Sequence, residues 1–285
     1  MPGRRPAPDG FAVATPLRSG HGENLVSAGT VTNVAKIPVL DIDPFDEGFL
    51  SNPDPFHELL REAGPVVYLR RYGIWAMARF AEVQAALRDH TTFCSAAGVG
   101  LSDFTKDKPW RPPSLLLEAD PPEHSRARRV TARALSPRAL EHLRDGFEQH
   151  AQQMVADVVA RGAFDGIADL AEAYPLRVFP DAVGLSPDGR QNLLTYAGMV
   201  FNGFGPRNRL FTESMAAAEP VRAWIADRCR RAALSPDGLG AGIYAAVDRG
   251  EITEDEAGLL VRSLLSAGVD TTVHTLAWAD RKSVV

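Results

Sequence analysis

An acid and an alcohol, Asp270 and Thr271, lie next to each other in the apolar stretch "LLSAGVDTTVHTLAWA" near the end of the chain. On a helix, Ser263, Ala267 and Thr271 share one face, because residues three and four positions apart are neighbours. A carboxyl group beside a hydroxyl group, held away from bulk water, can deliver protons to a reaction centre. The same residues are also compatible with one solvated edge of an ordinary helix.

Two further features of this helix concern its backbone. Gly268 costs about 1 kcal/mol relative to alanine in a helix interior, and it lets another group approach the backbone closely. The hydroxyl groups of Thr271 and Thr272 can bond to a carbonyl one turn earlier and distort the helix. Thr253 and Glu256 have the spacing of a capping box, which predicts the start of the helix. If it continues to the end of the apolar stretch, it is roughly 40 Å long.

A basic segment, "DPPEHSRARRVTARALSP", begins at Asp120 and has prolines where a helix is expected to start. His124 and Arg128 are four residues apart, so on a helix they present convergent donors that suit a carboxylate. An exposed basic helix face explains this pair equally well. The segment carries four more arginines: Arg126, Arg129, Arg133 and Arg138.

The composition bounds the class of protein. The 285 residues are 45% hydrophobic with a net charge of −5, which is typical of a globular protein and gives no indication of nucleic-acid binding. No run approaches the roughly 18 apolar residues of a membrane helix, and the first residues lack the apolar core of a signal peptide. The two cysteines, Cys94 and Cys229, are far apart in the sequence and form no disulfide framework. They favour a reducing, cytoplasmic location.

The spacing of apolar residues predicts one mainly α-helical domain with a small β element. Residues 1–36, rich in Gly, Ser, Pro and Thr, are expected to form a disordered leader. Runs at Val66–Leu69 and Ile74–Ala78, separated by a turn, predict a hairpin. The long segment Thr91–Pro122, rich in Gly and Pro, predicts a functional loop. The helices expected after the hairpin cover approximately residues 79–90, 121–135, 136–160, 169–185, 186–205, 213–234, 237–252 and 253–279.

Two motifs together resemble those of cytochromes P450. "AGVDTT" resembles the oxygen-activation motif A-G-x-D/E-T of the long central helix, and "DPPEHSRAR" resembles the start of the helix that holds the haem propionates. The resemblance covers about Ile37 to Ala279 and implies the N-terminal part of the P450 fold, ending at the long central helix. Longer stretches, including "DLAEAYPLRVFPDAVGL" and "YAGMVFNGFGP", are similar to a bacterial group that oxidises para-substituted benzoates such as 4-methoxybenzoate.

The resemblance implies a haem b cofactor, O2 as co-substrate and specific roles around the haem. Thr271 is the expected alcohol that hydrogen-bonds to oxygen at the iron, and Asp270 is the expected acid that links this position to a proton supply. The small residues Ala267 and Gly268 are expected to leave room for O2. His124 and Arg128 are expected to hold a haem propionate. Electrons are expected from an iron–sulfur ferredoxin with an NAD(P)H-dependent reductase. The remaining arginines of the basic segment either dock that ferredoxin or form a solvated charge run.

A benzoate has an anion at one end and the reactive group at the other, so the resemblance also implies an anion-binding cluster away from the iron. Its expected members are Arg111 and Ser114 in "WRPPS", and Arg262 and Ser263 on the last helix. The helical pair lies roughly 10–13 Å before the acid and alcohol, which suits one aromatic ring. The expected apolar wall consists of Leu117, Phe201 and Phe204. From the sequence alone, Arg262 also fits a surface position, and the phenylalanines also fit core packing.

The resemblance breaks down at the haem ligand. The family supplies a thiolate from an F-x-x-G-x-x-x-C-x-G loop and an E-x-x-R pair from a helix after the central one, and neither follows here. Neither Cys94 nor Cys229 has that context, so no metal ligand is assigned. The residues "DRKSVV" (280–285) match the translation of a sequencing-library adaptor and are interpreted as a non-native tail. We therefore expect this chain to be an inactive fragment of a P450. One alternative is a non-catalytic helical protein that binds an aromatic acid or a partner. The other is a P450 with another substrate, such as a terpene or fatty acid.

Overall fold

A small sheet begins the described part of the chain. The computed structural model describes residues 37–283, so the predicted leader lies outside the described residues. Strand β1 (Val39–Leu40) pairs in parallel with β2 (Val67–Leu69), and β2 pairs antiparallel with β3 (Ile74–Ala76), with Tyr68 opposite Trp75. The predicted hairpin is therefore confirmed. Strand β1 was not predicted, because it contributes only two residues.

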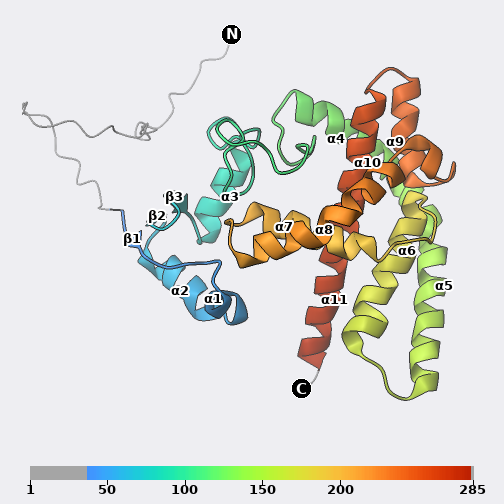
Figure 1. Ribbon diagram of the computed structural model, residues 1–285, viewed down its shortest axis with the longest axis horizontal. Helices are drawn as coiled ribbons and strands as arrows, with labels where there is room; N and C mark the ends of the chain where they lie inside the picture. Colours follow the sequence, from blue (N-terminus) through green and yellow to red (C-terminus); the bar gives the residue numbers. More distant parts are fainter. Residues whose placement is uncertain (1–36, 284–285) are drawn as a thin grey trace, which may run out of the picture. The chain divides into compact units, whose positions relative to one another are not determined.

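The rest of the described chain is helical apart from its loops (Figure 1), which confirms the mainly α fold with a small β element. No helix or strand lies between α3 and α4, so the predicted long loop is also confirmed. The α-helices are α1 (Glu47–Ser51), α2 (Asp54–Ala63), α3 (Phe80–Arg88), α4 (Glu123–Ala134), α5 (Pro137–Arg161), α6 (Ala173–Val183), α7 (Asn192–Phe204), α8 (Arg209–Arg228), α9 (Leu239–Asp248), α10 (Glu254–Gly268) and α11 (Asp270–Ser283). A π-helix, η1 (Gly166–Glu172), precedes α6, and a 3₁₀ turn, η2 (Arg231–Ala233), follows α8.

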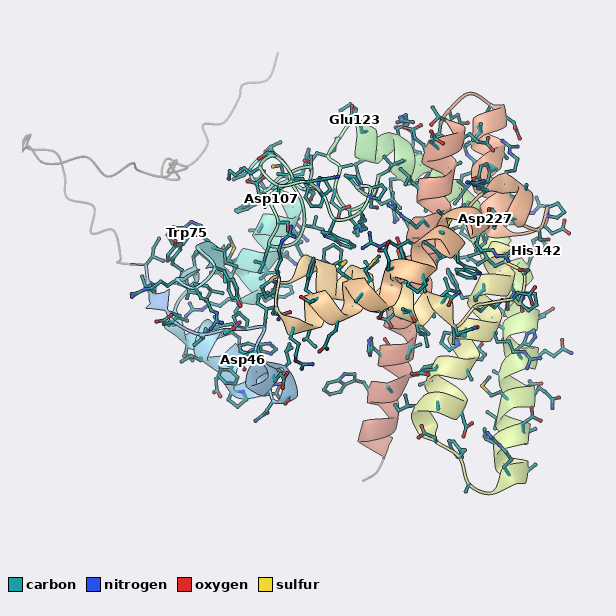
Figure 2. The ribbon with its side chains drawn as sticks, in the orientation of Figure 1. Asp46, Trp75, Asp107, Glu123, His142 and Asp227 are labelled. Atoms are coloured by element: carbon teal, nitrogen blue, oxygen red, sulfur yellow. The ribbon has the colours of Figure 1, made fainter. Side chains whose placement is uncertain are left out.

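The hydrophobic core includes α10 and the helices packed against it, among them α7 and α9, and it holds α10 in place. Large side chains from each of these helices are completely or almost completely buried, among them Leu193, Met199, Ile243, Leu260 and Leu265. Burying one such side chain contributes about 1.5–3 kcal/mol. Acidic side chains such as Asp107, Glu123 and Asp227 are exposed instead (Figure 2). The residue pattern therefore separates a rigid apolar centre from a charged surface.

The start of α10 is fixed by its own cap and by α4. Thr253 Oγ1 accepts a hydrogen bond from the Glu256 amide at 3.2 Å, and the Glu256 carboxylate accepts one from the Thr253 amide at 2.8 Å. This confirms the predicted capping box. Arg126 of α4 also donates two hydrogen bonds to the Glu256 carboxylate, so one acid both caps α10 and joins it to α4.

The predicted long helix is interrupted at Val269, where α10 ends and α11 begins (Figure 1). Thr271 Oγ1 donates to the carbonyl of Ala267 at 2.6 Å, and Thr272 Oγ1 donates to the carbonyl of Gly268 at 3.1 Å. The predicted back-bonding of these hydroxyls is therefore confirmed, and the helix is distorted at this point. Helix α11 continues to Ser283, so the backbone remains helical into the segment that was interpreted as a non-native tail; that interpretation stays a prediction.

No helix within residues 37–283 combines the length and the apolar character that crossing a membrane requires.

Candidate substrate and cofactor site

One cavity collects the residues that the sequence assigned to substrate binding. It has a volume of about 310 Å³ and lies between the long loop, α7 and the adjoining ends of α10 and α11. All seven predicted substrate residues line it, and so do Ala267 and Thr271. The complete lining is Arg111, Ser114, Leu116, Leu117, Tyr196, Val200, Phe201, Phe204, Arg262, Ser263, Ser266, Ala267 and Thr271.

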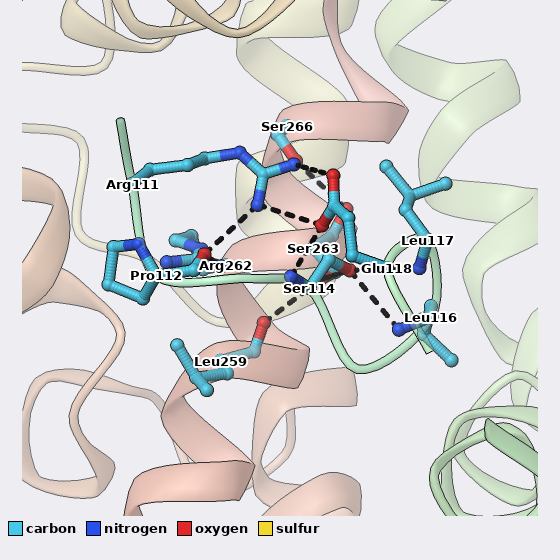
Figure 3. Close-up of polar contacts among 10 residues, drawn as sticks. All are labelled: Arg111, Pro112, Ser114, Leu116, Leu117, Glu118, Leu259, Arg262, Ser263 and Ser266. Atoms are coloured by element: carbon cyan, nitrogen blue, oxygen red, sulfur yellow. Dashed lines mark hydrogen bonds and ion pairs between the residues drawn. The ribbon is translucent and has the colours of Figure 1, made fainter. Parts of the chain in front are cut away.

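Cationic and hydroxyl groups lie close together among the residues that line this cavity (Figure 3). Ser114 Oγ of the loop and Ser263 Oγ of α10 lie 3.2 Å apart, within hydrogen-bonding distance. Arg262 Nη2 donates to the Pro112 carbonyl at 2.9 Å, so the loop is tied to α10 a second time. Arg262 is half-buried, and burial is the main reason why its pKa is lowered. A partly desolvated cation beside two hydroxyl groups is well suited to an anionic ligand.

The second predicted cation, Arg111, already has a carboxylate partner within the chain. Its two terminal nitrogens donate to the two oxygens of Glu118, at 3.1 and 2.8 Å (Figure 3). The side chain of Arg111 is 6% exposed and that of Glu118 is 0% exposed. Glu118 also accepts a 2.6 Å hydrogen bond from the Ser114 amide. The role of Arg111 as a direct anion ligand stays a prediction, and Glu118 is a member of the cluster that sequence reasoning missed.

Apolar and aromatic groups form the middle of the cavity. Phe204 lies edge-on to Trp110, with ring centroids 6.1 Å apart, and the guanidinium carbon of Arg111 lies 4.9 Å from the Trp110 ring centroid. Leu117 and Phe201 line the same cavity, but each is 46% exposed. The Phe204 ring therefore packs against Trp110, whereas Leu117 and Phe201 remain partly open to solvent.

The expected catalytic pair begins α11, about two helical turns after Ser263 of the anion cluster. Thr271 lines the cavity and is exposed, whereas Asp270 is not one of the lining residues. The Asp270 carboxylate is 13% exposed and lies 3.4 Å from Nε2 of His274, whose side chain is 71% exposed. Asp270 is thus a mostly buried acid in contact with a histidine that is exposed to solvent.

Gly268 has a packing role that the sequence did not specify. A Cβ atom at this position would lie within 2.6 Å of Cδ1 of Phe179 and closer still to two other ring atoms. The predicted close approach to the Gly268 backbone is confirmed, and the approaching group is Phe179 of α6. The glycine therefore permits α6 to pack against α10, whereas its role in making room for O2 stays a prediction.

Comparison with known proteins identifies the family. No protein-family model matches the chain. Cytochrome p450 CYP199A2 of Rhodopseudomonas palustris is 53% identical over 274 residues, which are 96% of this chain and 63% of that protein. The chain belongs to the cytochrome P450 family. Erythromycin C-12 hydroxylase of Saccharopolyspora erythraea is 30% identical over 222 residues, 76% of this chain and 54% of that relative. The chain thus spans less than two thirds of the length of these P450 relatives.

Solved structures give the same P450 fold. CalO2 superposes with a TM-score of 0.65 at 24% identity, covering 82% of this chain and 60% of CalO2. A mutant of P450 EryK in complex with erythromycin B superposes with a TM-score of 0.62 at 26% identity, covering 82% of this chain and 61% of EryK. The observed fold is therefore that of part of a cytochrome P450.

The residues present fit one face of the haem that the family implies. Ala267 and Thr271 are exposed at the open end of the cavity, and the apolar side chains of Leu117 and Phe201 remain partly uncovered beside them. A flat apolar group would cover such a surface, because uncovered apolar patches favour association. Cys94, near the start of the long loop, is exposed and therefore lacks a shielded environment.

The proposed propionate ligands lie on α4 and not in the cavity. His124 is half-buried near the start of α4, and Arg128 is exposed one turn later. Two of the other arginines of the basic segment form ion pairs within the chain, Arg126 with Glu256 and Arg133 with Glu251. The propionate and ferredoxin roles of these basic residues stay predictions.

The described residues contain no prepared metal site. No group of three or more His, Cys, Asp or Glu residues in the part of the chain that the structure describes could hold a metal ion. The thiol of Cys229 is buried, and burial raises its pKa to about 12, so it is a poor source of thiolate near neutral pH. That neither cysteine is the haem ligand stays a prediction.

Proposed function

We propose that the full-length protein is a cytoplasmic haem-thiolate monooxygenase that hydroxylates or O-demethylates para-substituted benzoates, and that the 285-residue chain by itself is inactive. Its co-substrate would be O2, and an iron–sulfur ferredoxin with an NAD(P)H-dependent reductase would supply electrons. The observation that carries the proposal is the polarity of one cavity: hydroxyl groups and Arg262 at one end, and Ala267 and Thr271 at the other. The two ends are separated by about two helical turns, which matches one aromatic ring between its carboxylate and its para substituent.

Each part of the cavity would have a defined task. Arg262 would pair with the substrate carboxylate, and Ser114 and Ser263 would donate hydrogen bonds to it. Phe201 and Phe204 would hold the ring in one plane and exclude water. Both hydroxyl groups and the cation belong to segments joined by hydrogen bonds, so the anion would be held by a rigid cluster.

The haem, when bound, would supply the oxidising chemistry at the open end of the cavity, with His124 and Arg128 at one propionate. Thr271 would present its hydroxyl group there. Asp270 would hold a proton close by and exchange it with solvent through His274, 3.4 Å away. Hydroxylation of an O-methyl group yields a hemiacetal, which releases formaldehyde and leaves a phenol.

The test of substrate binding compares 4-methoxybenzoate with its neutral amide by isothermal titration calorimetry. The acid should bind and the amide should not, and R262A should lose affinity for the acid by about 2 kcal/mol or more, because truncating one member of a buried charge pair costs about 2–5 kcal/mol. Arg144 forms an exposed ion pair with Glu141, so R144A is the matched control and should not change the affinity. Equal binding of acid and amide would contradict the proposal.

The test of the haem chemistry is the reduced, CO-bound absorption spectrum. The 285-residue chain would be expressed with haem supply beside the product of the continuous genomic reading frame. We expect the Soret band of a thiolate-ligated haem only in the second protein. The same band in the 285-residue chain would mean that Cys94 or Cys229 reaches the iron. A chain that binds the benzoate without haem would instead support the non-catalytic binding protein.

A further inference from the structure

Glu118 is a fully buried acid that pairs with Arg111, one of the residues lining the cavity that is proposed to bind acids. Its side chain is 0% exposed. Its carboxylate accepts hydrogen bonds from both terminal nitrogens of Arg111 and from the amide of Ser114. A buried carboxylate repels another anion, so its place beside an anion-binding cluster requires a reason.

The charges around this end of the cavity can be counted. Arg111 and Arg262 are positive and Glu118 is negative. Burial raises the pKa of Tyr196 above its usual value, and it raises the pKa of Cys229 to about 12, so both are neutral near pH 7. The cluster therefore carries one net positive charge. Arg111 is paired with the Glu118 carboxylate, whereas Arg262 donates to the neutral carbonyl of Pro112.

Resting on the proposed function above, we propose that Glu118 is a specificity-determining residue: it cancels the charge of Arg111, so that the cavity accepts aromatic acids with one carboxylate and rejects those with two. One carboxylate neutralises the single remaining charge of Arg262. A second carboxylate on the same ring leaves an uncompensated negative charge in a poorly solvated site, which is unfavourable. The acid thus restricts the anion site by charge, where the aromatic side chains restrict it by shape.

The geometry also indicates what the removal of this charge would do. Arg111 lines the cavity, and its Nε atom is buried without a hydrogen-bond partner among the described residues. The two terminal nitrogens are engaged by Glu118. In E118Q the amide can still accept the hydrogen bond from Ser114, but Arg111 loses its counter-charge and becomes a second cation facing the cavity.

The experiment measures dissociation constants for benzoate and isophthalate, which carries two carboxylates, by isothermal titration calorimetry at pH 7 on the 285-residue chain. The unmodified chain should prefer benzoate. E118Q should shift the ratio of the two constants toward isophthalate by about tenfold or more. R111M/E118Q removes both members of the pair, keeps one net positive charge, and should restore the original ratio. Glu141 is an exposed acid, so E141Q is the control and should leave the ratio unchanged.

The ratio of the two dissociation constants distinguishes selection by charge from loosening of the fold, because loosening would weaken the binding of both ligands together. An unchanged ratio in folded E118Q would overturn the inference while leaving the proposed function intact. If E118Q does not fold, R111M/E118Q provides the test. A ratio of dissociation constants equal to that of the unmodified chain supports the inference. Loss of benzoate binding overturns it, because it would show that Arg111 contacts the anion directly. Absence of benzoate binding in the unmodified chain would overturn both the inference and the proposed function.

Discussion

Replacing Gly268 by alanine tests why a glycine lies at the end of α10. A Cβ atom there would lie within 2.6 Å of Cδ1 of Phe179. Phe179 packs against the hydrophobic core, so its ring has little free space around it. Ordinary carbon–carbon contact is about 3.5–4.0 Å, so the ring would have to retreat by about 1 Å or more.

Two opposing effects set the magnitude. Alanine is favoured over glycine in a helix by about 1 kcal/mol. Overpacking a well-packed core costs about 1–3 kcal/mol. Because Gly268 is the last residue of α10, beside the break at Val269, the helix gain is at its smallest there. We therefore expect G268A to lower the free energy of unfolding by about 1–2 kcal/mol.

Urea unfolding followed by circular dichroism measures this difference from the shift of the midpoint at constant slope. The control is G146A within α5, where an added Cβ would meet nothing within 4 Å, and it should stabilise the chain or leave it unchanged. In an F179L background, the smaller side chain should relieve the clash, so the cost of G268A should fall by about 1 kcal/mol. If G268A stabilised the chain as much as G146A, the packing explanation of this glycine would be refuted.

Three further predictions concern the cap of α10 and the thiols. T253A should lower the free energy of unfolding by about 1 kcal/mol in urea titrations, because the cap of α10 is lost. The hydrogen bonds from Arg126 are the largest cause that lowers the pKa of Glu256 from 4.5 to about 2. Stability from this acid is therefore present above pH 4.5 and lost as the pH falls toward 2, and E256Q should flatten the stability–pH curve in that window. Iodoacetamide at pH 8 should label exposed Cys94 but not Cys229 in the folded chain, because burial raises the pKa of the Cys229 thiol to about 12. In urea it should label both cysteines. Mass spectrometry would count the adducts.

Features that depend on neighbouring residues could be predicted from the sequence. The capping box at Thr253 and Glu256, the hairpin and the back-bonding hydroxyls of Thr271 and Thr272 all involve groups within a few positions of one another. Local geometry allows few alternatives at such short separations. The family motifs added the long-range information, and all seven expected substrate residues line one cavity.

Features that depend on distant segments could not be predicted. The break at Val269 lies beside the back-bonding hydroxyls, but no sequence pattern shows which ring packs against Gly268. The pairing of Arg111 with Glu118 was missed because charged residues seven positions apart in a loop have no fixed geometry. The π-helical start of α6 was likewise assigned as an ordinary helix, because both have similar apolar spacing.

The joint between Ser114 and Ser263 has a consequence for the order of folding. These residues are 149 positions apart, and the hydrogen bond from Arg262 to Pro112 spans 150. Closing such a long loop costs conformational entropy that only the finished contact repays, whereas the caps and helix pairs form between nearby residues. The cavity is therefore expected to form late, after the apolar helices have associated. A ligand that binds there would stabilise only the last state on the pathway and would slow unfolding more than it accelerates folding.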